Sequence, residues 1–304
     1  MDFQKWAKNS LENVQEDHMG GVKQSLWPVY RKIIEQVRRV QPAGDNIYDY
    51  DWDLLIVVDA CRLDLMQEVA TDYDYIPEVN TVWSVDSTTA LWMQRTFKKR
   101  DTSDTTYICS NPFSADYLAK DDFNDLREVW KKAWNTPGTV PPRAITDATI
   151  DSMRNKESSR TIAHYLQPHC PFIPKPDLSE GKRKSEFGDQ DHRDVWELYR
   201  DSVISFDELW EGYRQNLKLV LDDISLLLEN VSAEKVVITS DHGNALGRWG
   251  IYGHPPRMPH KSLREVPWIE TSAKENGDYS PEMTDYEQSQ EVDRDDQLAA
   301  LGYM

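Results

Sequence analysis

The sequence predicts an α/β fold in which helices sandwich a mainly parallel central sheet. Short, continuous apolar runs recur along the chain, as is typical of strands with both faces covered. Segments whose apolar residues have helical spacing lie between these runs. The predicted strands are 53–59, 105–109, 161–166 and 235–240. The predicted helices are 62–71, 90–97, 123–133 and 144–155, followed by a long segment from 191 to 231 that has room for two helices.

Composition divides the chain into three parts. Residues 1–45 are polar with helical spacing, and their stretch 26–40 is the most basic of the chain. Such a basic helix either packs beside the main domain or touches an anionic membrane surface. Residues 46–270 hold all the apolar runs and are predicted to form the main domain. Residues 271–304 are predicted to form an acidic tail that ends in a short helix.

The chain is strongly acidic, with 53 acidic against 35 basic side chains and a formal net charge of −18. Because such a surface repels phosphates, no nucleic-acid partner is expected. Salt would screen the self-repulsion of this charge, so a halophilic source is expected.

Cysteine usage and hydropathy indicate a location for the protein. Cys61, Cys109 and Cys170 form no CxxC pattern, which favours a reduced, cytoplasmic setting. Residues 1–13 lack the apolar segment of a signal peptide. No apolar run approaches the roughly 20 residues that a spanning helix needs, so membrane contact is expected to be peripheral at most.

Acid, imidazole and hydroxyl side chains follow the predicted strands or precede the next helix. Carboxyl ends of parallel strands meet at one edge of a sheet, where ligands bind in open parallel sheets. The residues expected at this edge are Asp59 and Arg62, His169 within 168–171, Asp241 and His242, His254, and the triplet Ser87, Thr88 and Thr89 in front of the helix 90–97.

This set contains the groups that attack on a phosphate or sulfate ester requires. Two aspartates and a histidine, here Asp59, Asp241 and His242, can bind a divalent cation. A hydroxyl that shares this cation becomes a better nucleophile, and N–H groups at a helix start can bind ester oxygens. Further histidines or an arginine would neutralise charge or protonate the leaving group.

Each residue taken alone also has a structural explanation. An aspartate at a strand end, such as Asp59, often caps the next helix, and Ser87 or Thr88 is a typical N-cap. Asp241 and Gly243 favour a turn. The hypothesis of a site therefore rests on the joint occurrence of these groups at one edge of the sheet.

In order along residues 53–303, these segments resemble the alkaline phosphatase and sulfatase superfamily. Residues 54–59 resemble its first strand with a metal-binding acid, 168–171 its PHxP segment, whose histidine faces the substrate, and 240–243 its SDHG metal segment. Residues 252–269 resemble the stretch that returns to a further strand, and 298–303 resemble the LxxLGY ending. The resemblance implies an alkaline phosphatase-like fold, with a catalytic domain at 46–270.

The chain departs from the sulfatase pattern at two places. No C-x-P-x-R or S-x-P-x-R segment is present to form a formylglycine, so an unmodified hydroxyl is implied. Ser87 fits best by its distance from the helix, with Thr88 and Thr89 close behind. Ala60 stands where sulfatases carry a second acid, a pattern nearer the single-metal phosphoglycerol and phosphoethanolamine transferases, which use a threonine.

The resemblance implies a metal-dependent hydrolase or transferase acting on a phosphate or sulfate ester of a small molecule or glycan. One ion of Mn²⁺, Zn²⁺ or Ca²⁺ is expected at Asp59, Ser87, Asp241 and His242. A second ion would need three further ligands, of which His254 and His169 or His164 could supply some but not a full set. His169 and His254 are expected to act on the ester, with Arg62 as a further candidate. The alternative is a non-catalytic binding or scaffolding module, which Ala60 and the ambiguous nucleophile favour.

Overall fold

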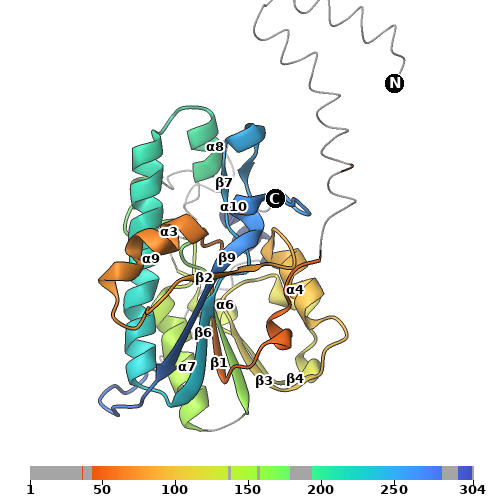
Figure 1. Ribbon diagram of the computed structural model, residues 1–304, viewed down its shortest axis with the longest axis vertical. Helices are drawn as coiled ribbons and strands as arrows, with labels where there is room; N and C mark the ends of the chain where they lie inside the picture. The colour runs from red at the N-terminus through yellow and green to blue at the C-terminus, as the bar shows by residue number, and fades with distance from the viewer. Residues whose placement is uncertain are drawn as a thin grey trace, which may run out of the picture. The chain divides into compact units, whose positions relative to one another are not determined.

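A computed structural model describes residue 36 and residues 43–135, 138–155, 158–178, 194–282 and 294–302 (Figure 1). The predicted helical segment 1–45 therefore lies outside the described residues, apart from residue 36 and the last three positions. Residues 283–293 and 303–304 of the predicted acidic tail also lie outside them, whereas α11 (Arg294–Ala300) is the short helix expected near its end. Within the described part, no helix combines the length and the hydropathy needed to cross a bilayer.

The central sheet has seven strands in the order β2-β9-β6-β1-β5-β3-β4. Strand β1 lies in its middle and pairs in parallel with β5 and β6, whereas β9 is antiparallel to β6 and β2. The predicted, mainly parallel sheet is thus confirmed. The strands are β1 (Leu54–Val58), β2 (Asn80–Trp83), β3 (Thr102–Cys109), β4 (Phe123–Glu128), β5 (Arg160–Tyr165), β6 (Ala233–Thr239) and β9 (Glu265–Ala273), beside a separate pair, β7 (Ala245–Leu246) and β8 (Tyr252–Gly253).

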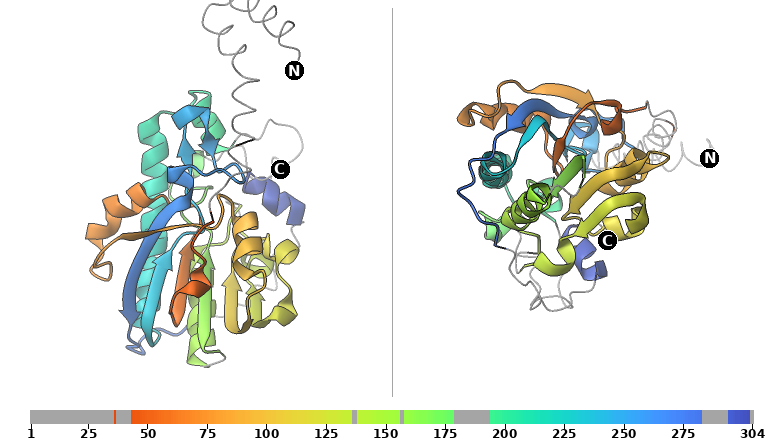
Figure 2. Two further views of the ribbon diagram at one scale, coloured as in Figure 1. Left: turned by 45° about the vertical axis from the view of Figure 1, so that its right-hand side comes forward. Right: turned by 90° about the horizontal axis from the view of Figure 1, so that it is seen from below.

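Helices cover both faces of this sheet, as the apolar runs predict. Alternate residues of β1 enter two different cores: Leu54 and Ile56 pack with α7 and α9, and Leu55 packs with α4. Figure 2 shows α7 and α9 on the same side of the strands. The helices are α3 (Leu63–Val69), α4 (Thr89–Phe97), α5 (Ser114–Tyr117), α6 (Trp130–Ala133), α7 (Pro142–Arg154), α8 (Val195–Arg200), α9 (Phe206–Glu229) and α10 (Lys261–Arg264).

The prediction of one helix over 123–133 is wrong. Residues 123–128 form the edge strand β4, and only the single turn α6 follows it. An edge strand buries few side chains, here Phe123 and Leu126, and this spacing of three residues resembles a helical face. The long segment 191–231 divides into α8 and α9, because Ser205 forms a capping box with Glu208 that begins the second helix.

Strand register brings the chemically important segments to one edge of the sheet. Val58 pairs with Tyr165, and Val57 pairs with Thr239. The residues that follow β1, β5 and β6 therefore emerge side by side. The segment that precedes α4 is held to the same edge of the sheet by Arg264. This side chain is fully buried, and its guanidinium group donates to the Ser84 carbonyl oxygen at 2.7 Å.

Gly44 packs directly against this segment, so substituting it tests the arrangement. A Cβ at position 44 would lie 2.3 Å from the backbone oxygen of Ser84. We expect Gly44→Ala to cost about 1–3 kcal/mol of stability, which lowers the melting temperature by roughly 2–10 °C. The exposed helical substitution Gln94→Ala is the control and should leave the melting temperature nearly unchanged. Equal melting temperatures for the two variants would contradict this packing.

Candidate metal centre

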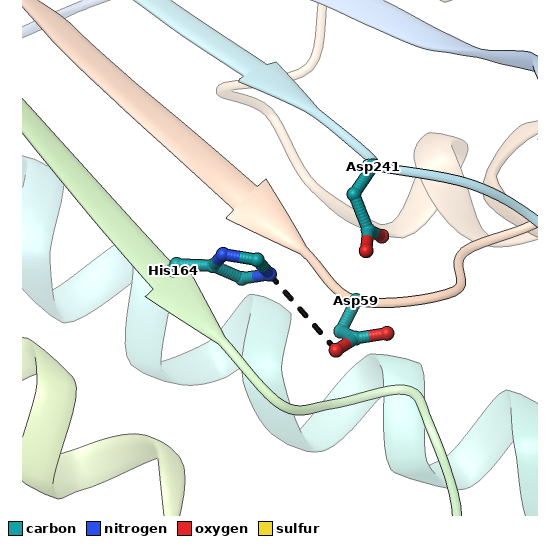
Figure 3. A group of neighbouring side chains, drawn as sticks. All are labelled: Asp59, His164 and Asp241. Atoms are coloured by element: carbon teal, nitrogen blue, oxygen red, sulfur yellow. Dashed lines mark ion pairs between the residues drawn. The ribbon is translucent and has the colours of Figure 1, made fainter. Parts of the chain in front are cut away.

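Two fully buried aspartates face each other at the carboxyl ends of β1 and β6 (Figure 3). Asp241 Oδ1 accepts hydrogen bonds from the backbone N–H groups of Ala60 at 3.0 Å and His242 at 2.9 Å. Ala60 has a φ of 60°, a left-handed conformation that turns its N–H toward Asp241. Asp241 Oδ2 has no hydrogen-bond partner within the described residues. One carboxylate oxygen is thus held by the backbone while the other remains available for a ligand.

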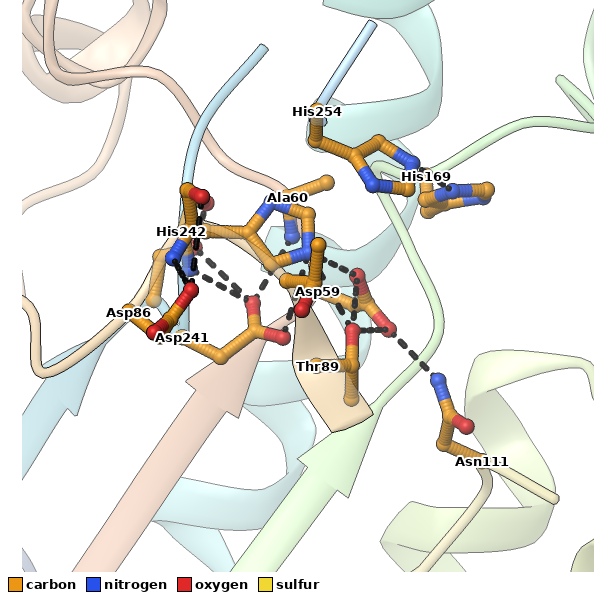
Figure 4. Close-up of polar contacts among 12 residues, drawn as sticks. Asp59, Ala60, Asp86, Thr89, Asn111, His169, Asp241, His242 and His254 are labelled. Carbon is orange, nitrogen blue, oxygen red and sulfur yellow. Dashed lines mark hydrogen bonds and ion pairs between the residues drawn. The ribbon is translucent and has the colours of Figure 1, made fainter. Parts of the chain in front are cut away.

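The hydroxyl of Thr89, rather than that of Ser87, lies beside these acids. Thr89 Oγ1 is 3.4 Å from Asp59 Oδ2 and 3.2 Å from His242 Nε2 (Figure 4). Ser87 Oγ instead donates to the Pro255 carbonyl oxygen at 2.7 Å. Thr88 caps α4 by accepting from the Leu91 N–H group, so Thr89 is the first residue of the helix. Spacing alone could not distinguish the three hydroxyls; the position of the cap does.

His242 completes this group with a defined tautomer. Its Nδ1 lies 2.9 Å from the Gly243 carbonyl oxygen, which can only accept, so Nδ1 carries the proton. In the neutral ring, Nε2 then carries a lone pair. The Nε2 atom lies 3.5 Å from Asp241 Oδ2 and 3.8 Å from Asp59 Oδ1. This lone pair points at the same space as the two carboxylates and the Thr89 hydroxyl.

Two further side chains reach Asp59. Asn111, which no sequence motif indicated, donates from Nδ2 to Asp59 Oδ2 at 2.9 Å. His164, predicted only as a ligand for a second ion, has its Nε2 3.9 Å from Asp59 Oδ2. Its Nδ1 lies 2.7 Å from the Tyr107 hydroxyl, and its Nε2 is buried without a hydrogen-bond partner in the described part of the chain. A histidine inside an otherwise apolar strand was the signal in the sequence.

The electrostatics of this group favour a bound cation. Burial and the charge of Asp241 together raise the pKa of Asp59 well above its usual value. Burial also acts to raise the pKa of Asp241, but the neighbouring His242 and His164 lower it overall. Burial lowers the pKa of His164 to about 4, so its ring is neutral, the form that binds metals.

The donor set therefore fits a divalent cation. Ligand atoms of Asp59, His164 and Asp241 all lie within 4.8 Å of one another. Asp241 Oδ2 and His164 Nε2 are buried polar atoms without hydrogen-bond partners among the described residues, and each would gain a partner from an ion at this point. Two carboxylates in one buried site repel each other, and a cation removes this repulsion.

His169 and His254 form a second pair at the rim of the centre, as Figure 4 shows. Their Nε2 atoms are 3.1 Å apart, and the rings of His254 and His242 have centroids 4.6 Å apart. His169 Nδ1 lies 2.5 Å from the Cys170 carbonyl oxygen and must donate to it. When His169 is neutral, its Nε2 accepts a hydrogen bond and His254 Nε2 donates it.

Arg62, the remaining predicted residue, does not reach the acids. Its guanidinium group pairs with Asp64 and donates from Nη1 to the Asn244 carbonyl oxygen at 2.6 Å. The structure thus gathers Asp59, Thr89, Asp241 and His242 closely, places His169 and His254 next to them, and leaves Ser87 and Arg62 directed elsewhere.

No protein-family model matches the sequence, and no curated protein matches it by sequence similarity. Solved structures do match the fold. The soluble domain of lipooligosaccharide phosphoethanolamine transferase A from Neisseria meningitidis is 16% identical, with a TM-score of 0.51 over 73% of this chain and 76% of that one.

The integral membrane form of the same transferase is 14% identical, with a TM-score of 0.52 over 99% of this chain, which spans only 64% of that protein. A protein of the alkaline phosphatase superfamily from Vibrio parahaemolyticus also matches, at 10% identity and a TM-score of 0.35, over 81% of this chain and 70% of that one. The two transferase matches show that this chain shares the fold of a phosphoethanolamine transferase, one of the kinds of protein that its sequence pattern resembles.

Proposed function

We propose that this protein is a metal-dependent transferase or hydrolase of phosphate or sulfate esters, with Thr89 as its nucleophile. The observation that carries the proposal is the position of Thr89 Oγ1, which lies between Asp59 and His242 at the first turn of α4. The fold it shares with a phosphoethanolamine transferase supports the same chemistry. Either a phosphorus or a sulfur centre would suit the site.

Asp59, Thr89, Asp241 and His242 would hold one divalent cation, and His164 would add a further nitrogen ligand. A mixed set of carboxylate and imidazole ligands suits Mn²⁺ or Zn²⁺ better than Ca²⁺, which prefers oxygen ligands throughout. When bound, the cation would lower the pKa of the Thr89 hydroxyl and neutralise the ester oxygens. The first turn of α4, which begins at Thr89, would also offer backbone N–H groups to the ester oxygens.

The proposed reaction has two stages, in which Thr89 first takes up the phosphoryl or sulfuryl group and then releases it. The proton of the Thr89 hydroxyl passes to Asp59, whose Oδ2 is its nearest carboxylate oxygen, because the only lone pair of His242 would be used by the cation. The bond from Thr89 Oγ1 to phosphorus or sulfur forms while the bond to the leaving oxygen breaks. His254, whose Nε2 donates within the His169 pair, supplies the proton to that leaving oxygen. Water or an alcohol then attacks the covalent intermediate and gives a proton to His254. The bond to Thr89 Oγ1 breaks, and the released oxygen takes its proton back from Asp59.

A non-catalytic binding module is the second candidate, and one observation favours it. Where sulfatases carry a second acid, Ala60 contributes only a backbone N–H group to Asp241. A binding module does not need the Thr89 hydroxyl beside the carboxylates or the pair of His169 and His254. Turnover of an ester is expected for the enzyme and not for the binding module, so an activity assay distinguishes the two candidates.

Substitution of the hydroxyl residues tests the nucleophile. We expect Thr89→Ala to reduce turnover of nitrophenyl phosphate mono- and diesters, or of nitrophenyl sulfate, by at least roughly 10³-fold. Ser87→Ala is the matched control and should keep most of the activity, because Ser87 faces Pro255. Mass spectrometry of quenched reactions should find the covalent group on Thr89. Loss of activity in Ser87→Ala but not in Thr89→Ala would refute the assignment.

Thermal unfolding with added metal tests the cation site. At a concentration of Mn²⁺ or Zn²⁺ 100-fold above its Kd, we expect stabilisation of about 2.7 kcal/mol, which raises the melting temperature by roughly 5–10 °C. Asp241→Asn and Asp59→Asn should both abolish this shift. Asp59→Asn should do so without lowering the melting temperature of the metal-free protein, because burial and the charge of Asp241 already disfavour the ionised form of Asp59.

Two variants serve as references for this experiment. Asp49→Asn removes an acid far from the centre that pairs with Arg100, and it should keep the full metal-induced shift. His164→Gln should retain a shift but weaken the metal affinity by roughly 10–100-fold. The metal centre is wrong if Asp241→Asn responds to the ion as the unmodified protein does.

A further inference from the structure

His164 differs from the two aspartates because it lies within a strand, β5, rather than after one. Its side chain is fully buried, and its Nε2 atom points toward Asp59 (Figure 3). A histidine binds a cation only through a nitrogen that carries no proton. Whether His164 is a ligand is therefore decided at its other nitrogen, Nδ1, where the hydrogen-bond partner sets the position of the single proton of the neutral ring.

Strand register places Tyr107 beside this nitrogen. Cys109 in β3 pairs with His164, and Tyr107 precedes Cys109 by two residues, so all three side chains lie on one face of the sheet. The Tyr107 hydroxyl oxygen is 2.7 Å from His164 Nδ1, and both side chains are fully buried. The two rings are parallel within 8°, and Trp92 of α4 meets the His164 ring edge-on with centroids 5.6 Å apart. Contacts from β3 and from α4 therefore fix the imidazole ring in place.

The hydrogen bond between Tyr107 and His164 has two alternative arrangements of its protons. If the hydroxyl donates to Nδ1, the proton of the neutral ring lies on Nε2, which then cannot bind a cation. If Nδ1 donates to the hydroxyl oxygen, Nε2 carries a lone pair. Within the part of the chain that the structure describes, Nε2 has no hydrogen-bond partner, and Asp59 Oδ2 is 3.9 Å away. A proton on Nε2 would thus be a buried donor without an acceptor, whereas the lone pair would gain a partner from a cation.

Tyr107 can accept the Nδ1 proton because its own proton has another acceptor. Burial, and after it the neighbouring Cys109 thiol, raise the pKa of Tyr107 well above its usual value, so the hydroxyl keeps its proton. The Cys109 sulfur can accept this proton, as it also accepts the backbone N–H of Asn111 at 3.4 Å. The Cys109 thiol in turn donates to the Asn111 carbonyl oxygen at 3.5 Å. Each hydrogen of this buried chain therefore has an acceptor when His164 presents its lone pair.

We propose that Tyr107 is a positioning residue of the metal centre, which accepts the Nδ1 proton of His164 and so presents the Nε2 lone pair to the cation. The inference rests on the proposed function only in placing a cation between Asp59 and Asp241. Among the described residues, Tyr107 makes no hydrogen bond to either aspartate, so its effect on the cation passes through His164.

Binding of Co²⁺ to the full chain tests this inference without any turnover. Co²⁺ occupies the same kinds of site as Zn²⁺, and its visible absorption reports the number and kind of its ligands. Tyr107→Phe keeps the ring and removes only the hydroxyl. We expect it to weaken Co²⁺ affinity by roughly 10–100-fold and to give the spectrum of His164→Leu, a variant that has no nitrogen ligand at this position. In the His164→Leu background, Tyr107→Phe should change the affinity by less than about twofold.

The matched control is Tyr165→Phe, which removes another fully buried hydroxyl. The Tyr165 hydroxyl bonds with Thr146 Oγ1 at 3.0 Å, and its ring packs in the core on the other face of the sheet from Tyr107. This variant should lower the melting temperature about as much as Tyr107→Phe, but it should leave the Co²⁺ affinity and spectrum unchanged.

Three outcomes of this experiment have different meanings. Unchanged Co²⁺ affinity in Tyr107→Phe, or an equal loss of affinity with and without His164, would overturn the inference while the metal centre and Thr89 stand. No binding of Co²⁺ by the unmodified protein would refute the metal centre of the proposed function, and this inference with it. The expected pattern of affinities in a protein that turns over no ester would support the inference and count against the proposed function.

Discussion

The structure depends on the parallel pairing of β1 with β5 and β6, which places Asp59 and Asp241 together in a site that water does not reach. Two buried carboxylates in one site oppose folding unless something compensates their charge. Backbone N–H groups compensate one oxygen of Asp241, and Asn111 compensates one of Asp59. The negative charge of the two carboxylates that these hydrogen bonds leave uncompensated would favour a bound cation.

Helix α4 and His242 place a hydroxyl group and a nitrogen lone pair beside the two carboxylates. Thr88 begins the helix, and its neighbour Thr89 is thereby directed at the carboxylates. The carbonyl oxygen of Gly243 sets the tautomer of His242, so that its lone pair faces the same space. The Thr89 hydroxyl is thus placed by the capped start of α4, and the His242 ring by a carbonyl oxygen of the loop after β6. Groups that are already oriented need little reorganisation during a reaction.

Much of this could be predicted from the sequence, because apolar runs and the residues after them report strand ends directly. Asp59, Asp241 and His242 were found in this way. The edge strands β2 and β4 could not be predicted, because they bury few side chains and therefore lack a continuous apolar run. The choice among the three hydroxyls required three-dimensional information, since any of them could cap a helix. Asn111 lies two residues after the end of β3 and belongs to no motif.

The most direct test of this account is an anomalous-difference map from crystals grown with Zn²⁺. The account predicts a peak between Asp59, Asp241 and His242, with Thr89 Oγ1 roughly 2 Å from the ion. Density for zinc only at surface sites, with the two buried carboxylates left without an ion, would contradict the account.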